Sequence, residues 1–246
     1  MIIVYTCIVD DYDDLIAQPT FNGVRYICFS DSIHSSHFRN WEIFPIPNTE
    51  IIEPNLINRF VKAYFFELGF EEEFSMYIDG NVLLKSDPTI FLDQFKQSSA
   101  SIAAFKHPYR QNILQELDEL IRVNKLSSDE IDKTNLLLKR MKDNGFDFQS
   151  TLTAGYIILR KHNDNELKIS MRSWLNIIMN ECKRDQMSLQ YVLWRNNIEM
   201  MLLDSICDSA SFFKRYNHGN YLDFIPRNHQ DFLKKVMLKI RNIYRK

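Results

Sequence analysis

Glycine is scarce in this chain, and none of it forms a loop typical of phosphate binding. Only six of the 246 residues are glycine. Neither GxGxxG nor GxxxxGK(S/T) follows the apolar stretch over residues 1–9, which is the first predicted strand. Those loops use glycine to let the backbone approach a phosphate closely. The sequence therefore argues against the nucleotide-binding folds that depend on a glycine loop.

Cysteine is also sparse, and its spacing excludes the usual metal and redox motifs. The four cysteines stand at positions 7, 28, 182 and 207. None forms a CxxC pair, so neither a zinc ribbon nor a dithiol redox motif is indicated. Cys7 and Cys28 lie in apolar runs and are expected in the core. This usage fits a reducing compartment, and we expect a cytoplasmic protein.

Long apolar runs and an excess of one charge are missing as well. No run approaches the roughly 18 apolar residues of a membrane-spanning helix. The first residues lack the basic region and cleavage site of a signal peptide, so none is expected. Thirty basic residues nearly balance 32 acidic ones, and the net charge is −2. A surface built for nucleic acid is therefore not predicted.

What the chain does have is an alternation of strand-like and helix-like segments. Apolar runs predict strands over 1–9, 23–31, 99–105, 151–160 and 198–204. Residues 75–84 predict a strand, a turn and the start of a second extended run. Helical spacing predicts helices over 58–70, 112–145, 165–182 and 185–197, with Ser127 and Glu130 as a capping box. Such alternation is typical of an α/β domain with a mixed, mostly parallel sheet flanked by helices. We expect one domain over 1–230.

The last segment, 231–246, has a composition of its own. Six Lys and Arg residues accompany a single acid, Asp231, and apolar residues recur at helical spacing. This pattern predicts a basic amphipathic C-terminal helix. It could pack on the domain or lie on anionic lipid, which would make the protein peripheral on the inner face of a membrane.

Polar residues gather where the predicted strands end, and ligands bind there in open α/β sheets. Carboxylates accept hydrogen bonds from ribose hydroxyls and base N–H groups, and a tyrosine ring can stack on a base. This set predicts a site for a nucleoside. The residues are Asp10, Asp11 and Tyr12 after the first strand, Asp31 after the second, Asp79, Gly80 and Asn81 after the third, and His107 and Arg110 after the fourth.

The third of these strand ends, in "FSMYIDGNVLLKSDP", resembles the Asp-x-Asp motif of GT-A glycosyltransferases, which binds a metal and a nucleotide sugar. Gly80 would permit close approach of a ligand. Asn81 stands where those enzymes have a second aspartate, and its neutral amide can ligate Mg²⁺ or Mn²⁺ without adding charge. The resemblance implies Asp79 and Asn81 as metal ligands. Apart from the resemblance, His218 in "YNHG" is a further candidate ligand for a metal or a diphosphate. The departure predicts weak metal dependence or metal-independent action.

Other segments extend the resemblance. "TLTAGYIILR" is similar to the strand of family 8 glycosyltransferases that lines the sugar-donor pocket, which implies roles for Ala154 and Gly155. "KRDQMSLQYVLW" resembles the Asp-Gln helix start of many GT-A enzymes and implies Asp185 and Gln186. The segments "NRFVK", "YIDGNVLL", "FKHPYR", "IILRKH" and "KRDQMSL" follow the order of the glycosyltransferase-like family catalogued as domain of unknown function 616. The likeness covers roughly residues 1–200.

The resemblance implies a GT-A-like fold, Rossmann-like as in nucleotide-diphospho-sugar transferases. It also implies transfer of a sugar, hexosyl or related, from a nucleotide-diphosphate donor to a glycan or lipid-linked acceptor. Bacterial surface polysaccharide biosynthesis, of capsule or lipopolysaccharide, is the expected setting. Arg59 and Lys62 share a helix face and are expected at the donor. Lys62, His107 and Arg110 would balance phosphate charge, with Asp185 and His107 as catalytic residues.

Two other functions remain open from the sequence. A non-catalytic module that binds a nucleotide sugar or glycan on the same fold is favoured by Asn81. A phosphohydrolase with an aspartate nucleophile would need Asp-x-Asp-x-Thr, and "DDYDDL" lacks the threonine. Stereochemistry is open too, because the family 8 likeness implies retention whereas Asp185 could be the general base of an inverting enzyme.

Overall fold

The computed structural model describes residues 1–203, 212–216 and 218. The helix predicted over 231–246 and the end of the domain predicted over 1–230 lie outside these residues. Among the described residues, no helix has the length and apolar character needed to cross a membrane.

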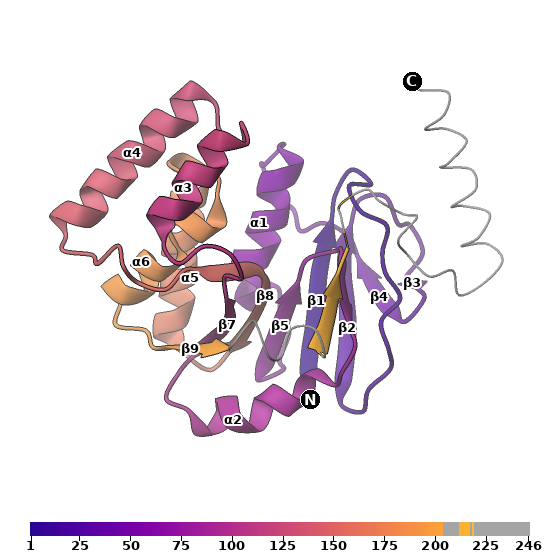
Figure 1. Cartoon of the computed structure of the whole chain (residues 1–246). Coiled ribbons are helices and arrows are strands. Elements are labelled where there is room, and N and C mark those ends of the chain that lie inside the picture. Colours follow the sequence, from indigo (N-terminus) through magenta and orange to yellow (C-terminus); the bar gives the residue numbers. More distant parts are fainter. Residues whose placement is uncertain (204–211, 217, 219–246) are drawn as a thin grey trace, which may run out of the picture.

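A central sheet of eight strands organises the fold (Figure 1). Its order is β3-β4-β2-β1-β5-β8-β7-β9. The strands are β1 Ile2–Ile8, β2 Val24–Ser30, β3 His37–Phe38, β4 Trp41–Phe44, β5 Phe74–Ile78, β7 Ile102–Lys106, β8 Thr153–Lys161 and β9 Met200–Leu203. A separate antiparallel pair joins β6, Val82–Leu84, to β10, Phe213–Arg215.

The sheet is mixed but mostly parallel, as the sequence predicts. β1 runs parallel to both β2 and β5, β2 to β4, and β7 to β9. β8 is the exception inside the sheet, because it runs antiparallel to β5 and to β7. The amino-terminal end of β8 therefore lies at the same edge as the carboxyl ends of its neighbours.

Helices flank the sheet, and α2 lies at the opposite end of the strands from α3 and α4 (Figure 1). They are α1 Pro54–Tyr64, α2 Leu92–Gln97, α3 Ile113–Arg122, α4 Ser128–Asp143, α5 Asn165–Asn180 and α6 Leu189–Arg195. Short 3-10 turns are η1 Phe65–Glu67, η2 Pro88–Phe91 and η3 Asp185–Met187. The predicted helical stretch 112–145 is two helices, and the capping box of Ser127 and Glu130 at the start of α4 is confirmed.

Burial explains why some strands were visible in the sequence and others were not. Every residue of β1 and of β5 is buried, which is typical of strands covered on both faces and makes their sequences predominantly apolar. β3 and β4 were not predicted, because two and four residues with mostly partial burial leave little pattern. One apolar cluster includes Tyr5, Tyr77 and Trp174, and a second includes Val4, Met76 and Trp41.

Candidate functional site

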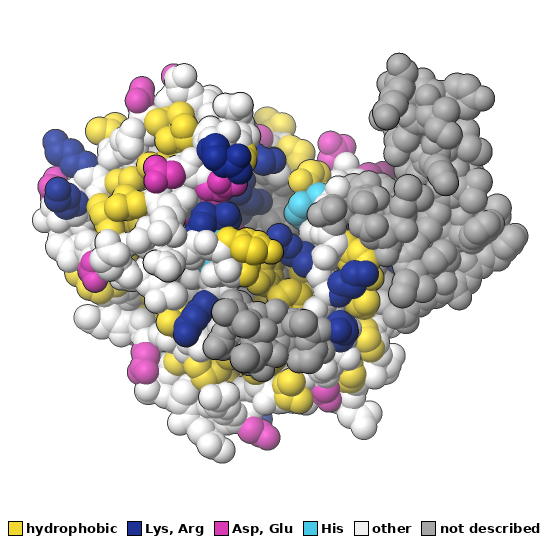
Figure 2. All heavy atoms as spheres, in the orientation of Figure 1, with side chains coloured by type: hydrophobic (Ala, Val, Ile, Leu, Met, Phe, Trp, Pro, Cys, Tyr) yellow, Lys and Arg dark blue, Asp and Glu magenta, His cyan; other side chains and the backbone are white. Residues whose placement is uncertain are grey.

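The polar residues predicted at the strand ends converge on one edge of the sheet. Ile78 at the end of β5 pairs with Ile157 of β8, and the Asp79 amide donates a 2.9 Å hydrogen bond to the Tyr156 carbonyl. Ala154 and Gly155 therefore run close to Asp79. Figure 2 shows that this side of the molecule is hollowed, with Lys and Arg side chains gathered around the hollow.

The loop after β1 is held in an unusual backbone conformation. Asp10 and Asp11 have φ angles of 56° and 50°, in the left-handed region. Aspartate tolerates this region better than most residues, but the conformation still costs on the order of 1–2 kcal/mol per residue. The Asp10 amide donates to both carboxylate oxygens of Asp31, at 3.0 and 3.2 Å. Asp31 thus positions the loop, whereas the sequence predicted donor contact for it.

Gly80 packs tightly against the end of β1. A Cβ atom at this position would lie 3.2 Å from Ile8 Cγ1 and 3.3 Å from Asp13 Oδ2. The close approach that the sequence predicted therefore involves the protein itself. Beside it, Tyr77 donates a 3.0 Å hydrogen bond to Asp79 Oδ1, and the Val82 amide closes the turn onto the Asp79 carbonyl at 3.0 Å.

Asn81 is buried and ties the turn to β10. Its Nδ2 donates to the Tyr216 carbonyl, and the Tyr216 amide donates to the Asn81 carbonyl at 2.9 Å. The donation from Nδ2 fixes the orientation of the amide. Its Oδ1 is buried and has no hydrogen-bond partner among the described residues. A buried oxygen without a partner lowers the stability of the fold by about 1–3 kcal/mol. A metal ion or a hydrogen-bond donor that binds Asn81 Oδ1 would restore that stability.

His218 is held beside Asn81 by Asp13, a residue that the sequence analysis did not single out. Asp13 lies 2.9 Å through Oδ2 from His218 Nδ1, and His218 Nε2 lies 3.5 Å from Asn81 Nδ2. The hydrogen bond that the His218 imidazole donates to the Asp13 carboxylate raises the pKa of His218, and the charge of Asp79 adds to the effect. The Tyr12 ring lies 5.0 Å from the imidazole. The predicted ligands Asp79, Asn81 and His218 therefore lie at one corner.

A standard three-residue metal cluster is not present in the part of the chain that the structure describes. No group of three or more His, Cys, Asp or Glu side chains there could hold a metal ion. The corner has an amide where such a cluster needs another carboxylate. Any metal bound by Asp79, Asn81 and His218 would therefore meet a single negative charge from the predicted ligands.

A second cluster surrounds Asp185. Lys62 Nζ is hydrogen-bonded to Asp185 Oδ2, and Arg59 Nη2 lies 3.9 Å from Oδ1. Both members of the Lys62–Asp185 pair are buried. Burial alone would raise the pKa of Asp185, but the charges of Lys62 and Arg59 hold it well below its usual range. Asp185 is therefore ionised at neutral pH, and the shared helix face predicted for Arg59 and Lys62 is confirmed.

The backbone of β8 lies directly against this ion pair. A Cβ atom on Gly155 would lie 3.1 Å from both Asp185 Oδ2 and Lys62 Nζ. Gln186 Nε2 donates a 3.1 Å hydrogen bond to the Thr153 carbonyl, which joins η3 to the start of β8. The residues predicted from the two resembling segments, 151–160 and 183–194, are thus brought together.

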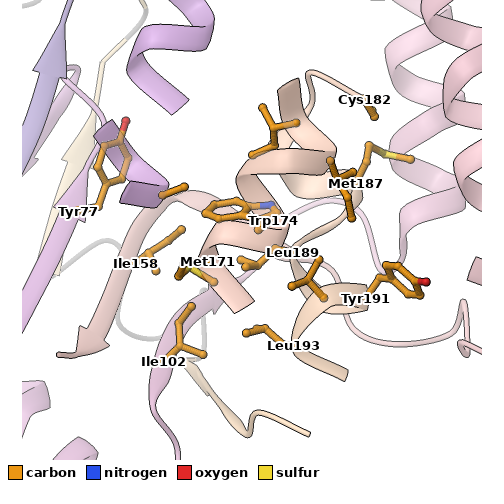
Figure 3. Packing of buried hydrophobic residues seen from close by; sticks show 14 of the residues in the cluster. Tyr77, Ile102, Ile158, Met171, Trp174, Cys182, Met187, Leu189, Tyr191 and Leu193 are labelled. Atoms are coloured by element: carbon orange, nitrogen blue, oxygen red, sulfur yellow. The ribbon is translucent and has the colours of Figure 1, made fainter. Parts of the chain in front are cut away.

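Core packing fixes the position of η3, and with it Asp185. The Trp174 indole donates a 3.0 Å hydrogen bond to the Asp185 carbonyl. Figure 3 shows the Trp174 ring among Met171, Met187 and Leu189 in the buried cluster. Because these groups are immobilised by packing, the carboxylate that η3 presents to the site is held rigidly.

Tyr77 and Arg59 connect the two clusters. Lys62 Nζ lies 4.7 Å from the centre of the Tyr77 ring, while the Tyr77 hydroxyl donates to Asp79. Burial alone would lower the pKa of Arg59, but the negative charge of Asp185, with that of Asp79, raises it. Arg59 thus lies within electrostatic reach of both the Asp79 corner and the Asp185 pair.

His107 and Arg110 form a local unit of their own. The amides of Tyr109 and Arg110 donate to His107 Nδ1 at 3.2 and 2.9 Å, and Arg110 pairs with the buried Glu116. Burial first, and then the positive charges of Arg110 and Arg215, lower the pKa of His107 to about 4. In this structure His107 is therefore neutral near pH 7, and its predicted role in balancing phosphate charge stays a prediction. Its catalytic role remains a prediction.

Arg215 on β10 is a cation that sequence reasoning missed. Its guanidinium lies 4.9 Å from the centre of the Tyr156 ring. Its charge affects the pKa values of His107, Tyr156 and His218, so it lies within electrostatic reach of the site edge. No signal in the sequence indicated it, because β10 is three residues long and was not predicted.

Comparison with known proteins gives one match of broad coverage. A family model described as "TOD1/MUCI70, glycosyltransferase-like domain" matches residues 1–218. No curated protein matches the sequence.

Several solved structures resemble the fold at low identity. The galactosyltransferase LgtC, in complex with donor and acceptor sugar analogues, has 11% sequence identity and a TM-score of 0.45, and the match covers 83% of this chain and 74% of LgtC. The bifunctional glycosyltransferase WbbM has 11% identity and a TM-score of 0.49, with 96% of this chain and 44% of WbbM covered. Mouse xyloside xylosyltransferase 1 has 7% identity and a TM-score of 0.46, with 83% of this chain and 84% of the mouse protein covered. The chain thus spans less than half of the length of WbbM. Likeness at this level carries no argument about substrate or site.

Proposed function

Since the chain belongs to the TOD1/MUCI70 glycosyltransferase-like family, we propose that it transfers a sugar from a nucleotide-diphosphate donor to a glycan or lipid-linked acceptor. One observation carries this proposal. The Asp79 corner and the Lys62–Asp185 pair lie at the same sheet edge, joined by β8 and by Tyr77. Such an edge offers separate places for a nucleotide and for the sugar attached to it.

The nucleoside would bind against the loop after β1. Tyr12 is 58% exposed, so its ring is open to a base. Asp10 and Asp11 follow the last residue of β1 and are exposed, so their carboxylates can accept from ribose hydroxyls or base N–H groups. The fixed backbone of the loop would reduce the ordering cost of binding.

The residues at the Asp79 corner fit a divalent cation. The Asp79 carboxylate and the unpaired Asn81 Oδ1 are the hard oxygen ligands that Mg²⁺ and Mn²⁺ prefer, and a neutral His218 could add Nε2. When bound, the cation would neutralise charge on the diphosphate as it leaves. Because one carboxylate supplies all the negative charge of this set, we propose that the metal dependence is weak. Arg59 and Arg215 would then provide part of the compensating positive charge.

The donor sugar would lie against Gly155 and Asp185. Because Gly155 has no Cβ atom, there is room beside the ionised Asp185 carboxylate. This carboxylate can accept hydrogen bonds from sugar hydroxyls. The low pKa of Asp185 makes it a poor general base, because efficient bases have pKa values near the working pH. We therefore assign it to orienting the sugar and stabilising positive charge in the transition state.

The acceptor and setting in the proposal rest on the sequence resemblance. We keep a glycan or lipid-linked acceptor in bacterial surface polysaccharide biosynthesis, at the cytoplasmic side of the membrane. The alternative is a module that binds a nucleotide sugar without transferring it, and Asn81 in place of a second aspartate favours that alternative. Turnover of a bound nucleotide sugar separates the two.

Binding of a nucleoside diphosphate is the first test. Uridine or guanosine diphosphate is expected to raise the Tm of the protein, since a ligand at 100 times its Kd adds about 2.7 kcal/mol. Tyr12→Ala should lose most of this shift because the stacking surface is gone. Ile90→Ala, which removes an exposed side chain beside α2, should keep it. Absence of any shift at millimolar nucleotide, with and without Mn²⁺, would refute the proposal.

The metal site can be tested through Asn81→Asp. The aspartate cannot donate to the Tyr216 carbonyl and buries a further negative charge beside it. Without metal, we expect this variant to unfold at a lower Tm than the wild type, with a cost of about 1–3 kcal/mol. Millimolar Mn²⁺ should recover much of the loss in the variant and change the wild type less. Equal responses of the two proteins to Mn²⁺ would contradict a metal site at this corner.

A further inference from the structure

A pocket beside α3 is lined by none of the residues of the Asp79 corner or of the Lys62–Asp185 pair. It is lined by Tyr109, Arg110, Gln115, Asp118, Glu119 and Arg122 and has a volume of about 470 Å³. Tyr109 is 82% exposed, although it is a large aromatic side chain. An exposed aromatic ring at the rim of a polar pocket is a feature of ligand-binding surfaces.

The charges of the pocket are largely paired internally. Arg110 is bound to Glu116, and Arg122 donates to both carboxylate oxygens of Glu119, at 2.8 and 2.7 Å. Asp118 has no hydrogen bond or ion pair with any described residue. The lining thus carries two arginines and two carboxylates, which gives it no net charge, and both arginines are already paired. That balance disfavours phosphate or uronic acid and suits an uncharged ligand.

The groups left available are suited to hydroxyls. The Asp118 carboxylate can accept from hydroxyl groups, and the Gln115 amide nitrogen can donate to them, since the Gln115 oxygen is already engaged by the Gln111 amide at 2.8 Å. The Tyr109 ring offers a flat apolar face at the same place. An apolar face together with an acceptor and a donor matches a pyranose ring, which has C–H faces and hydroxyl edges.

Backbone hydrogen bonds fix this pocket relative to the donor edge. The His107 amide donates to the Leu152 carbonyl at 2.8 Å, and the Leu152 amide donates to the Gln111 carbonyl at 2.7 Å. Both ends of the loop that presents Tyr109 are therefore held by one residue. Leu152 precedes Gly155 by three residues, about 10 Å in an extended strand. The pocket is thus held in a fixed position relative to the strand that carries Gly155.

We propose that this pocket binds a neutral sugar residue of the acceptor glycan, away from the residue that receives the transferred sugar. The inference rests on the proposed function, because it makes the pocket a specificity subsite of the same transferase. It narrows the acceptor to an oligosaccharide with an uncharged pyranose several positions from the reacting end.

Binding to an array of neutral and acidic oligosaccharides tests the subsite. The wild type is expected to retain one or more neutral glycans, and Tyr109→Ala and Asp118→Asn to weaken that binding at least tenfold. Ile90→Ala and Asp93→Asn, which alter exposed side chains in η2 and α2, should bind as the wild type does. Retention of acidic glycans only, of no glycan, or of neutral glycans equally by the pocket variants would overturn the subsite.

The nucleotide response separates this result from the proposed function. Tyr109→Ala and Asp118→Asn are expected to show the same Tm shift with uridine or guanosine diphosphate as the wild type. A normal nucleotide shift without glycan binding would remove the subsite alone. Loss of the nucleotide shift in the wild type would remove the proposed function itself.

Discussion

Asp185→Asn is expected to lower kcat for sugar transfer by about 100-fold or more while the affinity for the donor changes little. The carboxylate lies against Gly155 and is held ionised by Lys62 and Arg59. A negative charge beside the reacting carbon interacts most strongly with the positive charge that develops in the transition state. The measurement is steady-state kinetics with donor binding determined in parallel.

Asp93→Asn is the matched control, because it makes the same chemical change on an exposed side chain of α2. It should transfer at the wild-type rate. If Asp185→Asn also transfers at that rate, Asp185 acts only as the partner of Lys62. If the Asp185→Asn variant binds the donor more weakly but keeps the wild-type kcat, Asp185 interacts equally with the ground state and the transition state. The assignment of Asp185 to catalysis would then be wrong.

Lys62→Met is expected to destabilise the protein by about 3–5 kcal/mol at pH 7, because it leaves the Asp185 carboxylate without its nearest buried partner. The sign of the pH response follows from the depressed pKa of Asp185. In the wild type, the pair stabilises the fold above the unfolded pKa, about 3.9, and that contribution fades only as pH falls through the lower folded pKa. Denaturant unfolding at several pH values measures both effects.

A double variant separates stability from function. Lys62→Met with Asp185→Leu removes both charges, and we expect it to regain much of the stability that Lys62→Met loses. It should still fail to transfer sugar. Lys183→Met is the control for loss of an ion pair, since Lys183 and Glu53 are 43% and 49% exposed and such pairs contribute less than about 1 kcal/mol. A cost for Lys62→Met as small as that of the control would contradict a buried, energetically important pair.

The fold was predictable from the sequence where both faces of an element are buried. β1 and β5 are mostly apolar, each with a single hydroxyl residue of Thr or Ser, and the polar residues after them mark the edge at which they end. The capping box at Ser127 was equally readable, because it depends on residues three apart. The mixed, mostly parallel sheet flanked by helices is confirmed, whereas the short strands β3, β4 and β10 carried no pattern to detect.

The sequence predicted that the polar residues after the strands would come together, but not which of them would contact one another. Lys62 and Asp185 are 123 positions apart, and Asp13 and His218 are 205 apart, so no local pattern could pair them. Asp13 looks the same as its acidic neighbours until burial distinguishes it.

The protonation state of His107 could not be predicted from the sequence for the same reason. His107 follows a strand in a basic segment, which suggested a cation. Its pKa of about 4 arises from burial and from Arg110 and Arg215, and only the fold supplies those surroundings.

The most direct test is whether the protein consumes a nucleotide sugar. Wild type, Asp185→Asn and Asp93→Asn are incubated with a panel of uridine- and guanosine-diphosphate sugars, and released nucleoside diphosphate is measured by chromatography. We predict release from at least one donor by the wild type and by Asp93→Asn, with the rate lowered about 100-fold in Asp185→Asn. Tight binding without release by the wild type, in the presence of neutral glycan acceptors and Mn²⁺, would contradict transfer and leave a binding module.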